Sequence, residues 1–184
     1  MSVDLTPVIA ATAQWLIRAY PPPPGGPLGR ALAEAQARQA ATVAARLRYP
    51  GALDAELLVM VGPGGSDRLD RLSGADTAEY GEYGEYGEYG EPADAWRTWV
   101  DEVVASWAAC LLADPALAAT AVAALAVSGD GGTAADFRRL TAPGDHDHRA
   151  AALLRHPDLL APVAELHRPQ LLRALQADPL EPAC

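Results

Sequence analysis

The chain has 184 residues, of which half are hydrophobic, so it can bury a core as one domain or as one domain with an insert. All 14 of its basic residues are Arg, which excludes mechanisms that need a Lys, such as a Walker-type phosphate site or a Schiff base. The formal net charge of −10 and the lack of a cationic cluster argue against nucleic acid as a partner.

The hydrophobic residues are mostly Ala, Leu and Val, and there is a single Phe, so we expect an all-α fold. The absence of Lys fits a GC-rich bacterial genome. The first residues carry no basic region ahead of an apolar stretch, and Cys110 and Cys184 form no disulfide framework. The sequence therefore predicts a cytoplasmic protein without a membrane partner. Asp114–Pro115 interrupts the long apolar run from Val103 to Val127, which favours two packed helices over a membrane span.

Residues 1–61 are predicted to form an N-terminal helical segment. Thr6–Pro7 is a typical helix start, and the helix should run to about Tyr20. A second, Ala-rich helix is expected from about Leu28 to Tyr49. The short apolar run Leu53–Val61 fits a buried helix or a strand, and we favour a helix. With Gly62, Gly64 and Gly65 behind it, the run is also similar to a strand that enters a nucleotide-binding loop, but no alternation of strands and helices follows, so a turn is expected.

Residues 62–92 are predicted to be a flexible, low-complexity linker. This segment contains Glu-Tyr-Gly four times in succession, Glu79–Gly90. A Gly at every third position destabilises helix and strand alike, and the repeated carboxylates repel one another. We therefore expect a disordered acidic loop, which either divides the chain into two packed halves or is looped out from one.

Residues 93–184 are predicted to form a C-terminal helical domain. Apolar residues recur at helical spacing from Trp96 to Leu111, and Asp114–Pro115 should restart a helix that runs to about Val127. The stripe of Trp96, Trp99 and Trp107 could bind an apolar ligand or a partner, or could contribute to the core.

A weak internal repeat follows. The block Thr120–Leu125 aligns with Arg149–Leu154 at an offset of 29 residues. Asp114–Pro115, the Ala-rich helix, Gly129–Asp130 and a short helix from Ala134 to Leu140 resemble one unit of the HEAT-like repeat family, whose units are helical hairpins. The resemblance covers about 60 residues. It implies a short helical-repeat array, as an alternative to an Ala-rich helical bundle.

All four His residues lie close together in the sequence, among several Asp residues. His and Asp side chains are ligands for divalent metals, so a metal site is one interpretation, although the spacing matches no established signature. The other interpretation is a helix N-cap before Arg149, with acidic residues near the positive end of the helix dipole. The candidate ligands are Asp145, His146, His148, His156, Asp158 and His167.

No motif for a nucleophile or for paired catalytic carboxylates is present, so the sequence leans away from an enzyme without deciding the matter. The leading hypothesis is a non-catalytic helical module that binds another protein or itself and needs no cofactor. The alternative is a small metal-dependent enzyme or ligand-binding protein that uses the His146–His167 cluster.

Overall fold

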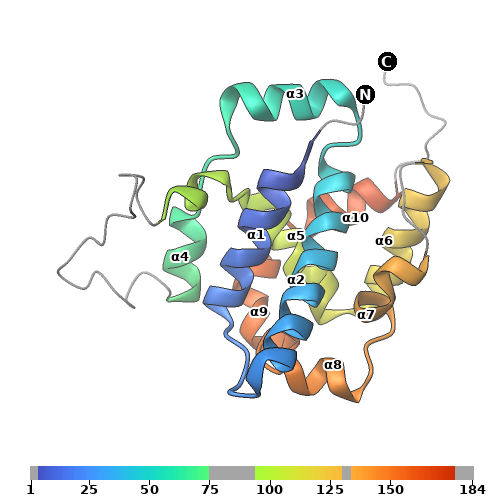
Figure 1. Cartoon of the computed structure of the whole chain (residues 1–184). Helices are drawn as coiled ribbons and strands as arrows, with labels where there is room; N and C mark the ends of the chain where they lie inside the picture. Colours follow the sequence, from blue (N-terminus) through green and yellow to red (C-terminus); the bar gives the residue numbers. More distant parts are fainter. Residues whose placement is uncertain (1–3, 75–93, 130–133, 177–184) are drawn as a thin grey trace.

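The computed structural model describes residues 4–74, 94–129 and 134–176 of the chain (Figure 1). These residues form ten α-helices and two short 3-10 helices, with no β-strand among them, so the all-α prediction is confirmed. None of the helices in the described ranges is long and apolar enough to cross a membrane.

The N-terminal part begins with two long helices, α1 (Thr6–Ala19) and α2 (Gly26–Arg48), which pack against each other. Each has a Pro in its first turn, where the missing amide hydrogen costs nothing. The buried residues of α2 are mostly Ala, and this allows α2 to pack closely between α1 and the C-terminal helices. Both helices lie within two residues of their predicted positions.

The centre of the bundle is α5 (Glu102–Ala113), in which nine of twelve residues are buried. It packs against α2 and α9. Asp114 then caps α6 (Pro115–Val127), because its Oδ1 accepts hydrogen bonds from the amides of Ala116 at 3.0 Å and Leu117 at 3.1 Å. The predicted restart at Asp114–Pro115 is therefore found at these residues.

The predicted helix from Trp96 to Leu111 is wrong in its first third. A short 3-10 helix, η2 (Ala95–Trp99), is followed by extended backbone at Val100 and Asp101. The cause is Asp101, whose Oδ1 accepts a hydrogen bond from the Val104 amide at 2.9 Å and so begins α5 as its N-cap. The apolar spacing of the sequence does not indicate this role for Asp101.

The remaining C-terminal elements are short. They are η3 (Ala134–Phe137), α7 (Arg138–Thr141), α8 (Asp145–Ala150), α9 (Pro157–Ala164) and α10 (Arg168–Gln176). The two blocks of the predicted repeat differ in structure, since Thr120–Leu125 lies within α6 whereas α8 ends at Ala150, inside the second block.

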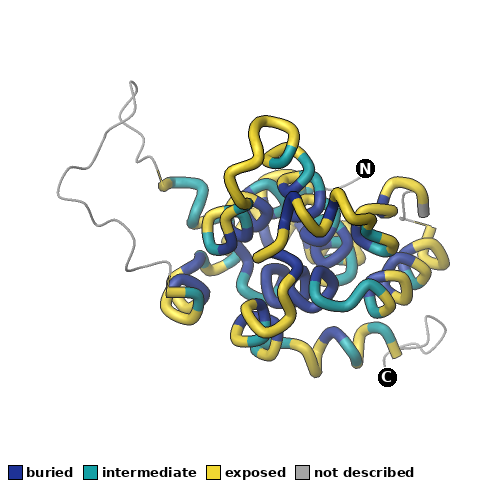
Figure 2. Tube along the Cα trace, turned by 90° about the horizontal axis from the view of Figure 1, so that it is seen from below, coloured by how far each residue is buried: buried dark blue, intermediate teal, exposed yellow. Residues whose placement is uncertain are grey.

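One hydrophobic cluster draws residues from both predicted helical parts, from Val8 in α1 to Leu171 in α10. Figure 2 shows the buried segments gathered at the centre of the molecule, with exposed segments around them. The predicted division at residues 61 and 92 stays a prediction about folding units. The Glu-Tyr-Gly tract, Glu79–Gly90, lies outside the described residues.

Two helices lie at the periphery: α3 (Ala52–Val61) and α4 (Asp67–Ser73). Figure 1 shows α3 lying across one end of the bundle, beyond the ends of α1 and α2. The favoured helix over Leu53–Val61 is thus confirmed and the strand alternative is wrong, but the helix is not buried as expected, since seven of these nine residues are exposed.

Candidate binding surface

The most unusual surface of the described part of the chain is on α3. Five large apolar side chains of this ten-residue helix are exposed, and we call them the α3 surface: Leu53, Leu57, Val59, Met60 and Val61. Met60 and Val61 are more than 80% exposed, at 81% and 83%. Only Ala55 and Leu58 of this helix are buried, and Leu58 belongs to the core cluster.

The sequence of α3 explains why so much apolar surface stays outside. A peripheral helix usually turns one apolar stripe inward and a polar face outward. Here the only polar residues are Asp54 and Glu56, so the apolar residues surround nearly the whole helix. Ala55 and Leu58, three residues apart, make the inward contact, and Leu53, Leu57 and Val61 follow one another at four-residue steps outside it.

Both ends of α3 are fixed by local geometry. At its start the Asp54 carboxylate accepts a hydrogen bond from the Gly51 amide at 3.1 Å. At its end the chain turns away at Gly62, with a φ of 77° that favours glycine. Gly64 and Gly65 also have positive φ angles, of 96° and 86°. The Gly-rich segment is thus a turn, as expected, and not part of a strand–loop–helix unit.

The two segments that flank α3 are attached to the same place in the bundle, the extended residues Val100 and Asp101. On the incoming side, the Tyr49 hydroxyl donates a hydrogen bond to Asp101 Oδ2. On the outgoing side, the Gly65 amide donates to the Val100 carbonyl oxygen at 3.0 Å, and Gly64 forms an antiparallel bridge with Asp101. Val100 and Asp101 therefore hold both sides of α3.

The environment of Tyr49 keeps its hydroxyl protonated. Burial raises the pKa of Tyr49 above its ordinary value, and the hydrogen bond to Asp101 and the negative charge of that carboxylate raise it further. The hydroxyl is therefore a stable donor to Asp101 at every physiological pH.

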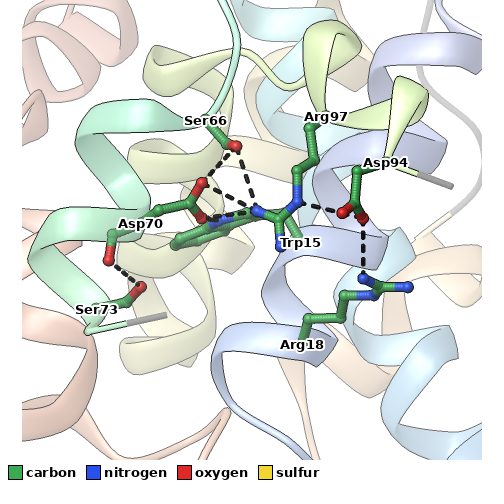
Figure 3. A network of polar contacts seen from close by, with 7 residues as sticks. All are labelled: Trp15, Arg18, Ser66, Asp70, Ser73, Asp94 and Arg97. Atoms are coloured by element: carbon green, nitrogen blue, oxygen red, sulfur yellow. Dashed lines mark hydrogen bonds and ion pairs between the residues drawn. The ribbon is translucent and has the colours of Figure 1, made fainter. Parts of the chain in front are cut away.

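A second set of contacts ties α4 to the bundle, as Figure 3 shows. The Asp70 carboxylate accepts hydrogen bonds from Trp15 Nε1 at 2.8 Å, from Ser66 Oγ at 2.7 Å and from Arg97 Nη1 at 2.9 and 3.0 Å. Arg97 also contacts Asp94, which pairs with Arg18. This network joins residues on both sides of 75–93 and supports the turn after α3, since Ser66 follows Gly65.

A third polar network lies inside the C-terminal part. The buried Arg155 guanidinium donates to Gln36 Oε1 at 2.7 Å, to the Leu112 carbonyl oxygen at 3.3 Å and to the Arg139 carbonyl oxygen. Burial lowers the pKa of Arg155 to about 10, although the nearby charge of Asp147 acts in the opposite direction. Arg155 thus cross-links three elements through neutral acceptors, which indicates a structural role.

The three Trp side chains singled out from the sequence do not form one open stripe. Trp107 is only 4% exposed, and its Nε1 donates to the His167 carbonyl oxygen at 3.1 Å. Trp96 and Trp99 are partly buried and pack against the core cluster. The Trp96 ring lies 5.1 Å from the guanidinium carbons of both Arg18 and Arg97. Little of the predicted Trp stripe is thus available to a ligand.

The predicted metal ligands are not brought together either. No group of three or more His, Cys, Asp or Glu side chains that could hold a metal ion occurs within residues 4–74, 94–129 and 134–176. His148, His156, Asp145 and Asp158 are exposed. His146 lines a cavity of about 380 Å³ with Arg138, Arg139 and Asp147, and the Asp147 carboxylate pairs with Arg139 at 2.9 Å.

The N-cap interpretation of this segment holds only in part, because the N-cap of α8 is Gly144 and the acidic residue that satisfies the helix start is Asp147, at the third helical position. Its Oδ2 accepts from the Gly144 amide at 3.0 Å at the start of α8, and its Oδ1 accepts from Arg139 Nη1 at 2.9 Å. Burial alone would raise the pKa of Asp147, but these two bonds lower it below its ordinary value. The helix begins about four residues earlier than the sequence indicated.

His167 lies apart from the other three His residues. Its Nε2 is 2.7 Å from Glu102 Oε1, and Glu102 also pairs with Arg68 at 3.2 Å. Ser106 is close, but its Oγ donates to the Ala164 carbonyl oxygen and accepts from the His167 amide, both at 3.0 Å. Ser106, His167 and Glu102 therefore do not form a relay from hydroxyl to imidazole to carboxylate.

No protein-family model, no curated protein and no solved structure matches this chain. The resemblance to HEAT-like repeats therefore stays a prediction.

Proposed function

We propose that the protein is a non-catalytic helical interaction module and that it binds another protein through the α3 surface. The observation that carries this proposal is the exposure of five large apolar side chains on one short helix. Scattered exposed apolar residues are normal, but a contiguous group on one element is typical of an interaction site.

The energetics favour covering this surface. Burial of a Leu, Val or Met side chain contributes about 1.5–3 kcal/mol relative to exposure. Leu57 and Met60, at 57% and 81% exposed, gain little of that energy within the chain itself. A partner that covers both side chains recovers a favourable free energy that the isolated fold does not use.

The attachment of α3 supports the same role. Tyr49 on one side and Gly64 and Gly65 on the other are held at Val100 and Asp101, so the helix is presented in one orientation. A surface that is ordered before binding loses less conformational entropy when the partner docks. The polar contacts around α3 thus lower the cost of association without adding a contact to the partner.

Site-specific crosslinking tests the proposal. A photo-reactive residue is placed at Met60 in the full chain, expressed in its native host, and the control places the same residue at Val127, which is 74% exposed on α6. We expect a discrete protein adduct from position 60 only, and we expect Leu57→Ser in the same chain to abolish it. No adduct from position 60, or the same adduct from both positions, would refute the proposal.

A further inference from the structure

The charged residues within the segment that carries the α3 surface all have the same sign. Between Tyr49 and Ser66 the charged residues are Asp54 and Glu56, and the segment contains no Arg. The next Arg residues along the chain have partners outside this segment or at its edge: the guanidinium carbon of Arg48 lies 5.6 Å from the centre of the Tyr49 ring, at the entry to α3, and Arg68 pairs with Glu102 at 3.2 Å. Within this segment the apolar side chains are therefore accompanied by negative charge alone.

This combination of shape and charge selects a class of partner. We propose that the occupant of the α3 surface is an amphipathic helix of another protein, with an apolar face flanked by Arg or Lys. The inference rests on the proposed function and specifies the chemistry of its partner. Asp54 and Glu56 then attract the flanking cations, while Leu57 and Met60 meet the apolar face.

The dimensions of α3 agree with this type of contact. A helix of ten residues is about 15 Å long, which matches three turns of a partner helix. Helices that dock in this way use anchors at i, i+3 or i+4, and i+7. Leu53, Leu57 and Met60 present the corresponding spacing of four and three residues.

The same charges disfavour two other occupants. In a symmetric contact between two copies, Asp54 and Glu56 of one α3 approach those of the other, and no Arg of this segment compensates them. Each copy also carries a formal net charge of −10, so the copies repel one another. An anionic lipid surface is repelled by the same carboxylates.

Three synthetic peptides of about 18 residues, or five helical turns, test the inference. The first has a Leu face and an Arg face, the second has the same Leu face with Glu in place of Arg, and the third is a scrambled form of the first. Binding of each labelled peptide to the full chain is measured by fluorescence anisotropy. We expect the Leu/Arg peptide to bind at least about tenfold more tightly than the other two.

Substitutions in the full chain locate the contact. We expect the double variant Leu57→Ser, Met60→Ser to weaken binding of the Leu/Arg peptide by at least about tenfold, and Glu56→Arg to weaken it severalfold. The matched control is Val127→Ser, which removes an apolar side chain of similar exposure from α6 and should leave binding unchanged. The scrambled peptide controls for attraction by net charge, because it carries the same charge without an apolar face.

The outcomes separate the inference from the proposed function. The inference is overturned if the Leu/Glu peptide binds as tightly as the Leu/Arg peptide, or if the α3 substitutions leave binding of the Leu/Arg peptide unchanged. In either case crosslinking from position 60 still tests the docking role separately. Concentration-dependent dimers that Leu57→Ser abolishes in sedimentation would identify a second copy as the occupant. Binding to phosphatidylcholine vesicles that requires Leu57 and Met60 would identify a lipid surface. Either result would also overturn the inference.

Discussion

The Tyr49 hydroxyl donates a hydrogen bond to the carboxylate of Asp101, and it thereby links the entry to α3 with the residue that caps α5. Because the same carboxylate accepts from the Val104 amide, one acidic side chain begins the central helix and holds the peripheral one. The order of α3 thus depends on the start of α5.

Removal of this link should loosen α3. We expect Tyr49→Phe to lower the free energy of unfolding by about 1 kcal/mol, measured by urea denaturation, because one hydrogen bond to a charged acceptor is lost. Amide hydrogen exchange in residues 52–61 should accelerate. Tyr20→Phe is the control, since the Tyr20 ring packs edge-on against Trp15 at 6.3 Å and no hydrogen bond joins its hydroxyl to another described residue. Equal effects of the two substitutions would contradict the link.

The orientation of α3 predicts opposite outcomes for two adjacent leucines. We expect Leu58→Ala to lower the free energy of unfolding by about 2–4 kcal/mol, because Leu58 is 6% exposed and belongs to the core cluster. Leu57→Ala, at 57% exposed, should change the free energy of unfolding by about 0.5 kcal/mol or less. The two variants have the same composition, so their difference in denaturation midpoint reports the packing of the helix. A larger loss for Leu57→Ala would reverse the assigned orientation.

The Asp70 network predicts a cost for neutralising one carboxylate. Asp70→Asn keeps the size of the side chain but removes the charge that Arg97 contacts with two bonds. We expect a loss of about 1–3 kcal/mol in the free energy of unfolding and a shift of the Trp15 indole N–H resonance. Asp67→Asn, at an exposed position on the same helix, is the control. A loss no larger than that of the control would show that the network adds nothing to stability.

Substitution of the buried Arg155 should lower the free energy of unfolding more than substitution of Asp70. We expect Arg155→Met to lower the free energy of unfolding by about 3 kcal/mol, because Gln36 Oε1 and two carbonyl oxygens are left without their donor. Arg155→Lys should recover only part of the loss, since an ammonium lacks the planar fork of a guanidinium. The exposed Arg173 supplies a control, Arg173→Met, for which denaturation should show little change. Full recovery by Lys would argue against the role of the fork.

Because the Cys110 thiol is buried, we expect the stability of the protein to depend on pH. Burial raises the pKa of its thiol to about 11, so the folded protein holds this proton more tightly than the unfolded chain, whose thiol ionises near its ordinary value. The associated stability is complete below that ordinary value and is lost as the pH rises towards 11. The free energy of unfolding, measured by urea denaturation, should decline from pH 8 to 10, and Cys110→Ala should make this decline less steep. Identical slopes would exclude the thiol as the cause.

Local chemistry explains which elements the sequence predicted. Helix starts at Thr6–Pro7 and Asp114–Pro115 were predicted from adjacent residues, and helices begin at both places. Asp114 is a side-chain cap as predicted, whereas Thr6 is already the first helical residue and α1 has no side-chain cap. The start of α5 was missed because apolar spacing from Trp96 onward concealed the capping role of Asp101, a residue that also fits the polar face of a helix. An Asp that caps a helix and an Asp on the exposed face of a helix look the same in the sequence. They differ only in backbone conformation.

The periodicity of the apolar residues did not predict the candidate surface. An apolar run without a polar face is usually interpreted as buried, and Leu53–Val61 was interpreted in that way, although seven of its nine residues are exposed. One signal was present in the sequence. Because Asp54 and Glu56 are the only polar residues of this helix, a helix that packs one face against the core must expose apolar residues on its other face. The Asp70 and Arg155 networks join residues up to 119 positions apart, and such pairings follow from tertiary packing alone.

The anchoring of α3 at a single place makes the segment from residue 50 to residue 63 exchangeable. Tyr49 before it and Gly64 and Gly65 after it contact Val100 and Asp101, and we expect these contacts to persist when another helix is placed between them. Leu58 is the one large side chain that a replacement helix must supply to the core. A graft that retains Leu58 and redesigns the outward positions should change which partner binds at the surface for which we propose a docking role, with the bundle beneath it unaltered.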